Sequence, residues 1–261
     1  MKRVLVAADL HSGHQVGLTH PDFERKPADT KSKQYKYYKI RQEMWKWFAE
    51  TVASLQPIDV LIVNGDAIDG RGEKSGSLEL LLLDRNEQVD CAAACIEVCK
   101  AKSVLMSYGT DYHVSGKAED WEDSLAEKVH ALKVESHGFA EIGGVRFDYR
   151  HHVGNSSVPY GRFTPIAKEK LWAFLWAERG EYPDSTIVLR SHVHHFDFCG
   201  GVDWLGLTTP ALQAYWTKYG TRRLSGTVDF GLVWFDIEGK DKWSWDYRVK
   251  RLKSRHDILR I

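Results

Sequence analysis

The chain of 261 residues has few cysteines, no net charge and no long hydrophobic run. Four cysteines are too few for disulfide bonds to stabilise a chain of this length, and their scarcity agrees with a reducing compartment. The 36 basic and 36 acidic side chains cancel, so the overall charge would attract neither nucleic acid nor an anionic membrane. Any binding of a polyanion must therefore come from a local patch.

The apolar runs are too short to cross a bilayer, which takes roughly 18 residues, and the longest are Leu78–Leu83 and Leu171–Ala177. A basic start followed by the apolar Val4–Ala8 has the charge order of a signal peptide. Asp9 ends that run before it reaches the length of a signal-peptide core. We therefore expect a cytoplasmic protein without a membrane segment.

Three cysteines recur at every fourth residue: Cys91, Cys95 and Cys99. On a helix this spacing places them along one face. Because free cysteine behaves as a small hydrophobic residue, we interpret that face as buried. A zinc site is the alternative.

Short apolar runs alternate with longer amphipathic stretches in the first half, which is typical of βα units around a buried sheet. Strands are expected at Val4–Ala8, Val60–Val63 and Val104–Met106. Helices are expected at Tyr38–Leu55, Leu78–Ala101, Ala118–Leu132 and Thr164–Gly180. Residues 14–37 are expected to form a long loop.

The second half contains more strands, with a hairpin signal at Gly143-Gly144. Strands are expected at Val145–Arg150, Thr186–Leu189, Trp204–Leu207, Val228–Ile237 and Trp243–Val249. We expect them to form a second, mostly antiparallel sheet. The predicted fold class is α/β, with two mixed β-sheets packed as a sandwich flanked by helices, and residues 1–261 forming a single domain.

Twelve histidines stand out against this background, and several follow predicted strands together with aspartates. The first three strands are followed by Asp9-Leu10-His11, by Gly65–Gly70 with Asp66 and Asp69, and by Gly109–His113. In α/β sheets, ligands lie outside the carboxyl ends of strands. In an extended segment, Asp9 and His11 lie on the same side and can bind one ion together.

Two further histidine clusters follow later strands. His151-His152 comes after Val145–Arg150, and Ser191–His195 comes after Thr186–Leu189. Any one of these histidines could be an ordinary core or surface residue. Five clusters, each placed after an apolar strand, instead indicate a metal site.

The order of these motifs resembles the calcineurin-like metallophosphoesterase superfamily, whose motifs run D-x-H, G-D-x-x-D, G-N-H-[DE], a single histidine after a strand, and G-H-x-H. Asp9-Leu10-His11 matches the first motif, Gly65–Asp69 the second, and His192 with His194 the last. The resemblance covers residues 4–195. It implies a two-sheet sandwich with two divalent metal ions at the strand ends, which could be Mn, Fe, Zn or Ni.

The resemblance also implies which residues bind each ion. One ion would be held by Asp9, His11 and His194, the other by His192 and the single histidine, with Asp66 bridging both. Relatives with a His-His pair at this place usually use the first histidine. We therefore expect His151 to be the ligand, with His152 as the alternative.

The third motif departs from the superfamily pattern, because it reads Gly109-Thr110-Asp111-Tyr112-His113 where Gly-Asn-His is usual. We expect Asp111 to supply the missing oxygen ligand, with the Thr110 hydroxyl as the alternative. His113, displaced by two residues, would protonate the leaving group. A competing interpretation is that the second metal site is incomplete and weak. Ser191, where the superfamily usually has glycine, moves no ligand.

The activity implied by the resemblance is hydrolysis of a phosphomonoester or phosphodiester by a hydroxide shared between two metal ions. Asp66 and His113 would be the catalytic side chains. Asn155 and Arg162 follow the histidine pair and could line the substrate pocket, with Arg162 gripping a phosphate. A solvated loop is the alternative for these two residues.

Nucleic acid is a second candidate partner. Basic and aromatic residues are interleaved between His14 and Lys39, and the segment Arg248–Arg255 is rich in basic residues. The alternative function is therefore a catalytically weakened protein that keeps the metal fold and binds nucleic acid or an assembly partner. Salt-dependent retention on DNA without turnover of any phosphoester would favour it.

Overall fold

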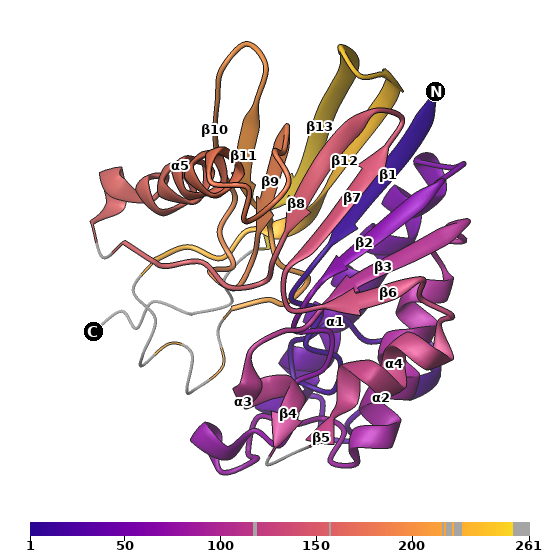
Figure 1. Cartoon of the computed structure of the whole chain (residues 1–261). Coiled ribbons are helices and arrows are strands. Elements are labelled where there is room, and N and C mark those ends of the chain that lie inside the picture. Colours follow the sequence, from indigo (N-terminus) through magenta and orange to yellow (C-terminus); the bar gives the residue numbers. More distant parts are fainter. Residues whose placement is uncertain (117–118, 157, 216, 218–220, 222–225, 253–261) are drawn as a thin grey trace.

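The computed structural model describes residues 1–116, 119–156, 158–215, 217, 221 and 226–252. Two mixed β-sheets pack face to face, and helices cover the outer face of each (Figure 1). This confirms the α/β sandwich flanked by helices. Within the described residues, no helix combines the length and apolar character that a membrane span requires.

The first sheet has six strands in the order β13-β12-β1-β2-β3-β6. They are β13 (Lys242–Lys250), β12 (Phe230–Gly239), β1 (Lys2–Ala7), β2 (Val60–Asn64), β3 (Ser103–Ser107) and β6 (Lys133–Glu135). The four strands β1, β2, β3 and β6 are parallel to one another, whereas β12 is antiparallel to β1 and to β13. The outer face of this six-stranded sheet is covered by α1 (Lys33–Ser54), α2 (Arg85–Glu97) and α4 (Trp121–Lys128).

The second sheet has five strands in the order β10-β11-β9-β8-β7. They are β10 (Asp197–Gly200), β11 (Leu205–Thr208), β9 (Ile187–Arg190), β8 (Val145–Tyr149) and β7 (Gly138–Ile142). The central strand β9 is parallel to both of its neighbours, and the two edge strands are antiparallel to theirs. The outer face carries α5 (Thr164–Glu178), whose Ile166 packs with Val188.

Apolar side chains of both sheets form one core between them. Val4 and Val6 of β1 pack in the same cluster as Phe147, Leu189 and Leu207 of the second sheet. Short elements complete the chain: α3 (Asp111–Val114), β4 (Ser115–Gly116), β5 (Glu119–Asp120) and 3-10 turns at Pro21–Phe23, Glu73–Ser75 and Pro159–Gly161.

The prediction that all late strands form one mostly antiparallel sheet is wrong. The hairpin of β12 and β13 joins the first sheet, where Val4 lies opposite Phe235 and Val6 opposite Val233. Consecutive residues of β12 are buried whichever face of the sheet they point to. This is expected because β12 has a neighbouring strand on each side and packed layers on both of its faces. The predicted Gly143-Gly144 hairpin between β7 and β8 is confirmed, and both glycines have positive φ, 60° and 86°.

Two helices have other limits than predicted. α1 begins at Lys33 because Ser32 caps it, its hydroxyl accepting a hydrogen bond from the Tyr35 N–H. α2 is shorter than predicted because Asp84 caps its start.

The expected loop 14–37 is partly core, since Val16 and Leu18 are buried. The helix expected from Ala118 begins outside the described residues, and its described part is α4.

The prediction of a buried cysteine face is confirmed. Cys91, Cys95 and Cys99 are free thiols buried beneath the first sheet. Burial raises the pKa of the Cys99 thiol to about 12, so it stays protonated and apolar. Among the described residues, these cysteines belong to no cluster that could hold a metal ion.

Candidate metal centre

The ends of five strands, β1, β2, β3, β8 and β9, bring the predicted polar clusters together. Three groups of side chains have ligand atoms within 4.8 Å of one another: Asp9, His11 and His194; Asp66, His151 and His192; and His11, Asp69 and His113. The loops after β1 and β2 run side by side, because the Asp9 N–H donates to the Gly65 carbonyl and the His11 N–H to the Asp66 carbonyl. Residues far apart in the sequence thus share one pocket.

The first group surrounds Asp9, which is completely buried. Its Oδ1 lies 3.1 Å from His194 Nε2 and 3.9 Å from His11 Nε2. Asp69 orients the His11 ring through a 3.0 Å contact between its Oδ1 and Nδ1. That contact directs Nε2 towards Asp9 and His194, the arrangement by which a carboxylate sets a metal-binding imidazole.

The second group surrounds Asp66. Its Oδ2 lies 3.0 Å from His151 Nε2 and also 3.9 Å from His11 Nε2, so the carboxylate stands between the two groups. The Nδ1 of His151 lies 2.8 Å from the Asn64 carbonyl and donates to it. In the neutral ring this bond assigns the proton to Nδ1 and leaves Nε2 as the ligand atom.

The backbone is strained where these side chains converge. Five of the candidate ligands have left-handed backbone angles, with φ values of 51°, 44°, 49°, 72° and 55° at Asp9, His11, Asp66, His192 and His194. Such angles are costly for residues other than glycine and concentrate at functional sites. The close approach also requires Gly65, where a Cβ would lie 2.5 Å from the His151 ring.

Charge is strongly coupled at the centre. Burial alone would raise the pKa of Asp66, but His151 outweighs it and holds the Asp66 pKa well below its usual value. Burial likewise opposes a charged His151, yet Asp66 raises its pKa to about 10. The pKa of His11 falls to about 4 through burial and the neighbouring His113, and that of His192 to about 4 through burial and His151.

The side chains present fit a divalent cation. Asp9 Oδ1 and His151 Nε2 are buried, and although they lie 3.1 Å from His194 Nε2 and 3.0 Å from Asp66 Oδ2, neither contact has hydrogen-bond geometry in the described part of the chain. An unsatisfied buried carboxylate and imidazole are costly unless an ion or a donor meets them. Mixed imidazole and carboxylate ligands suit Mn, Fe, Zn or Ni.

Thr110, rather than Asp111, lies in this pocket. Its hydroxyl donates to Asp66 Oδ2 at 2.8 Å and lies 3.4 Å from His192 Nδ1, and its N–H donates to Asp66 Oδ1 at 2.6 Å. Asp111 is exposed at the start of α3 and belongs to none of the three groups. The geometry therefore does not support the preference for Asp111 as the oxygen ligand and favours the alternative, Thr110.

The turn of α3 explains the displaced histidine. The His113 N–H donates to the Thr110 carbonyl at 2.8 Å, closing one helical turn. Residues three apart on a helix share a face, so His113 returns to the pocket despite the two extra residues. Its Nδ1 lies 3.0 Å from the Asp69 carbonyl, and its ring centre lies 4.6 Å from that of His11.

The two histidines after β8 differ in burial. His151 is buried and belongs to the Asp66 group, whereas His152 is exposed and belongs to none. The ring of His152 still lies near that of His192, with centres 5.1 Å apart. Its geometry suits the edge of the pocket rather than the ligand position.

Asn155 and Arg162 line a cavity of about 520 Å³ beside His192 and His194. The Arg162 side chain is held there by carboxylates, with Nε 3.1 Å from Asp197 and Nη2 3.6 Å from Asp229. Its charge is therefore already matched, which weakens its predicted role as a phosphate grip. Both residues do border the space next to the candidate ligands.

Sequence reasoning missed Glu122, which is fully buried at the start of α4. Its carboxylate accepts hydrogen bonds from the Gly109 N–H at 2.5 Å and the Ala67 N–H at 3.2 Å. It thus joins the loop after β2 to the loop after β3, behind Asp66 and Thr110. The available signal was its spacing from the buried Leu125 and Ala126, which places it on the core face of the helix.

No family model and no curated protein sequence matches this chain. Solved structures do match it. A purple acid phosphatase from yellow lupin seeds is 12% identical with a TM-score of 0.54, covering 95% of this chain and 51% of that one. An archaeal phosphodiesterase is 12% identical with a TM-score of 0.48, covering 94% and 99%. Vps29 from Entamoeba histolytica, complexed with Zn²⁺, is 11% identical with a TM-score of 0.43, covering 95% and 98%.

The chain therefore has the fold of the calcineurin-like metallophosphoesterases, as its motifs predicted. The likeness at this identity concerns the fold alone. It spans about half of the lupin phosphatase. The chemistry must be argued from the side chains of this chain.

Proposed function

We propose that the protein is a metal-dependent phosphoesterase with two divalent ions, one in the Asp9 group and one in the Asp66 group. The observation that carries this proposal is the position of Asp66 between His151 and His11, at 3.0 and 3.9 Å from their Nε2 atoms. A carboxylate between two imidazole sets can bridge two cations. Asp9, His11 and His194 would hold one ion, and His151, His192 and Thr110 the other.

Two bound ions would lower the pKa of water to near neutrality and neutralise charge on the phosphoryl oxygens. The side chains of the chain would do the rest. Asp69 holds the His11 ring in its ligand orientation, and Asn64 does the same for His151. Glu122 keeps the two loops in register behind Asp66 and Thr110.

His113 would supply the proton that the leaving group needs. Its Nδ1 faces the Asp69 carbonyl, so Nε2 is the atom that would exchange the proton. The ring lies against that of His11, at the edge of the pocket and partly exposed. A partly exposed imidazole can reach both the leaving oxygen and bulk water.

The direct test is metal removal and restoration. Protein stripped by a chelator should hydrolyse bis-p-nitrophenyl or p-nitrophenyl phosphate only after Mn²⁺, Fe²⁺, Zn²⁺ or Ni²⁺ is restored, and metal analysis should give two ions per chain. Asp66→Ala should abolish turnover and lower the metal content. Asp22→Ala, at a side chain 81% exposed, is the matched control. Full activity in excess chelator would overturn the proposal.

The hydroxyl of Thr110 at the ligand position is the observation that favours a second candidate function. A hydroxyl is a weaker ligand than the amide oxygen that the superfamily uses at this place, so the Asp66 group would bind its ion less tightly. The protein would then be a catalytically weakened one that keeps the metal fold and binds nucleic acid or an assembly partner. Salt-dependent retention on DNA without turnover of any phosphoester would support this candidate.

A further inference from the structure

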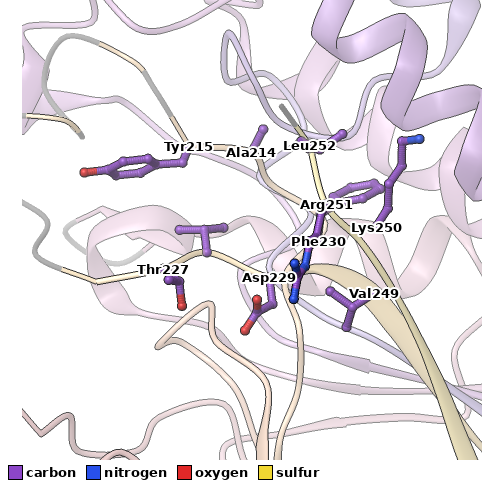
Figure 2. A pocket seen from close by; sticks show the side chains of 10 residues that line it. Ala214, Tyr215, Thr227, Asp229, Phe230, Val249, Lys250, Arg251 and Leu252 are labelled. Carbon is purple, nitrogen blue, oxygen red and sulfur yellow. The ribbon is translucent and has the colours of Figure 1, made fainter. Parts of the chain in front are cut away.

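The cavity beside the candidate ligands adjoins a second one. The first, of about 520 Å³, reaches from His192 and His194 to Tyr215, Thr227 and Val228. The second, of about 320 Å³, is lined by the same three residues on one side and by the end of β13 on the other (Figure 2). The shared wall makes the two cavities neighbours, so a ligand longer than a phosphate could extend from one into the other.

The second cavity has a basic wall, made by Lys250 and Arg251. The ammonium group of Lys250 lies 3.0 Å from Glu43, and the Asp229 carboxylate accepts a hydrogen bond from the Phe196 N–H and lies near Arg162. Arg251 is exposed and forms no ion pair with the residues that the structure describes. Its guanidinium therefore gives this cavity a positive charge that can bind a phosphate.

Four aromatic rings form a cluster further along β13, outside the residues that line either cavity: Phe196, Phe198, Trp245 and Tyr247. The centres of the Phe196 and Tyr247 rings are 4.5 Å apart, and those of Phe198 and Trp245 are 4.9 Å apart. They lie where the edge strands β10 and β13 of the two sheets meet. Phe198 is 50% and Tyr247 43% exposed, so this cluster offers ring surface to a ligand.

The alternation of β13 connects the Tyr247 ring to the wall of the second cavity. Successive side chains of a strand point to opposite faces, so Tyr247 and Val249 share one face, and Val249 and Arg251 both line the cavity. Arg248 lies on the other face, with its guanidinium 5.7 Å from the Trp234 ring centre. Tyr247 and Val249 thus follow one another on one face of β13, and Arg251 comes directly after the end of the strand.

We infer that the substrate is a single-stranded oligonucleotide that lies along this track, which rests on the proposed phosphoesterase function. The scissile phosphodiester lies at the candidate metal ligands, a further phosphate at Arg251, and bases stack on the exposed rings of Tyr247 and Phe198. Aromatic rings beside cations bind single strands without requiring one sequence. A phosphomonoester would leave the second cavity and the rings unused.

The reaction is a hydrolysis and needs no further reactant. The oxygen of one water molecule forms a bond to phosphorus, and the ester bond from phosphorus to one sugar oxygen breaks. One product keeps the phosphate with the oxygen of the water, and the released sugar oxygen takes a proton of that water to become a hydroxyl.

The experiment compares three substrates on metal-loaded protein: a single-stranded oligonucleotide, its double-stranded form, and bis-p-nitrophenyl phosphate, which is too small to reach Arg251. Arg251→Gln should lower kcat/KM for the oligonucleotide about tenfold, mainly through KM, and leave that for the small diester unchanged. Tyr247→Ala should lower only the oligonucleotide value, about fivefold or more. Arg179→Gln, at an exposed arginine at the end of α5, is the control and should change neither value.

Each result decides between the two proposals. If the small diester is cleaved but the oligonucleotide is not, or if Arg251→Gln lowers both values equally, the track is wrong and the phosphoesterase proposal stands. Equal cleavage of single and double strands would also overturn the track. If none of the substrates is cleaved, the phosphoesterase proposal fails, and fluorescence anisotropy still tests the track. Arg251→Gln should then lower the slope of log Kd against log salt concentration by about one, as expected for the loss of one phosphate contact. An unchanged slope would overturn the track.

Discussion

The hydroxyl of Thr110 donates a 2.8 Å hydrogen bond to the buried carboxylate of Asp66. The backbone N–H of Thr110 donates to the same carboxylate at 2.6 Å. Thr110 therefore orients the side chain that stands between the two groups of candidate ligands. It also places a neutral hydroxyl where an amide oxygen is usual in proteins with these motifs.

Substitution of Thr110 tests whether this hydroxyl supports metal binding. Thr110→Val keeps the shape but removes the hydroxyl, so the affinity of the weaker of the two metal sites should fall about tenfold. Thr110→Ser should restore it, and Thr110→Asn should strengthen binding because the amide oxygen is a better ligand. Calorimetric titration with Mn²⁺ measures these affinities. Unchanged affinity in Thr110→Val would show that the hydroxyl has no part in the site.

The histidine pair offers a matched comparison. His151→Ala should remove a ligand and leave Asp66 without its closest imidazole, so we expect loss of about one ion per chain and of turnover. His152→Ala, at the exposed neighbour, should keep the metal content and most of the activity. Metal analysis of the two purified variants checks this. Metal loss in His152→Ala alone would reverse the assignment.

Glu122 should make the stability of the metal-free protein depend on pH. Burial and the nearby Asp66 raise the pKa of Glu122 to about 8, so folding favours its protonated form. This contribution is fully present below the unfolded pKa of about 4.3 and is lost as the pH rises towards 8. Between pH 5 and pH 8, Glu122→Gln should therefore gain roughly 2 to 4 kcal/mol relative to the parent protein.

Urea unfolding in the presence of a chelator measures this difference at the two pH values. Glu122→Ala should lose about 2 to 4 kcal/mol at pH 5, because it leaves the Gly109 and Ala67 N–H groups buried without an acceptor. Glu87→Gln, at an exposed glutamate of α2, should change stability by less than about 0.5 kcal/mol. A Glu122→Gln difference that is the same at both pH values would contradict the prediction.

His113 can be tested through the leaving group. If it donates a proton, His113→Gln should lower kcat by about a hundredfold for an alkyl phosphodiester, whose leaving oxygen is a strong base. The loss should be several times smaller for a p-nitrophenyl ester, whose leaving group departs without a proton. Steady-state kinetics on both esters, with metal content measured in parallel, checks this. Equal losses on the two esters would remove His113 from the role of acid.

Much of the candidate site followed from the sequence because its residues lie directly after apolar strands. Asp9, His11 and Asp66 follow the first two strands, and parallel strands place their carboxyl ends at one edge of a sheet. His192 and His194 come from the other sheet. Only their motif spacing related them to that edge, and the structure places His194 Nε2 3.1 Å from Asp9.

Other features could not be read from local pattern. The sequence favoured Asp111 as the oxygen ligand, but a one-turn helix exposes its side chain and returns His113 to the pocket. Glu122 drew no prediction, because only tertiary packing shows that two N–H groups from separate loops need an acceptor there. The sheet that takes β12 depends on which strand edges remain open, and this is a property of the assembled fold.

The sequence by itself determined the α/β class, the strand ends that carry chemistry and the types of ligand, because hydrophobic periodicity and residue identity are local properties. The tertiary structure decided which of Thr110 and Asp111 faces Asp66, which histidine of the pair is buried, and where the two cavities join. These outcomes depend on distances between segments far apart in the chain, and such distances are set only when the two sheets pack against each other.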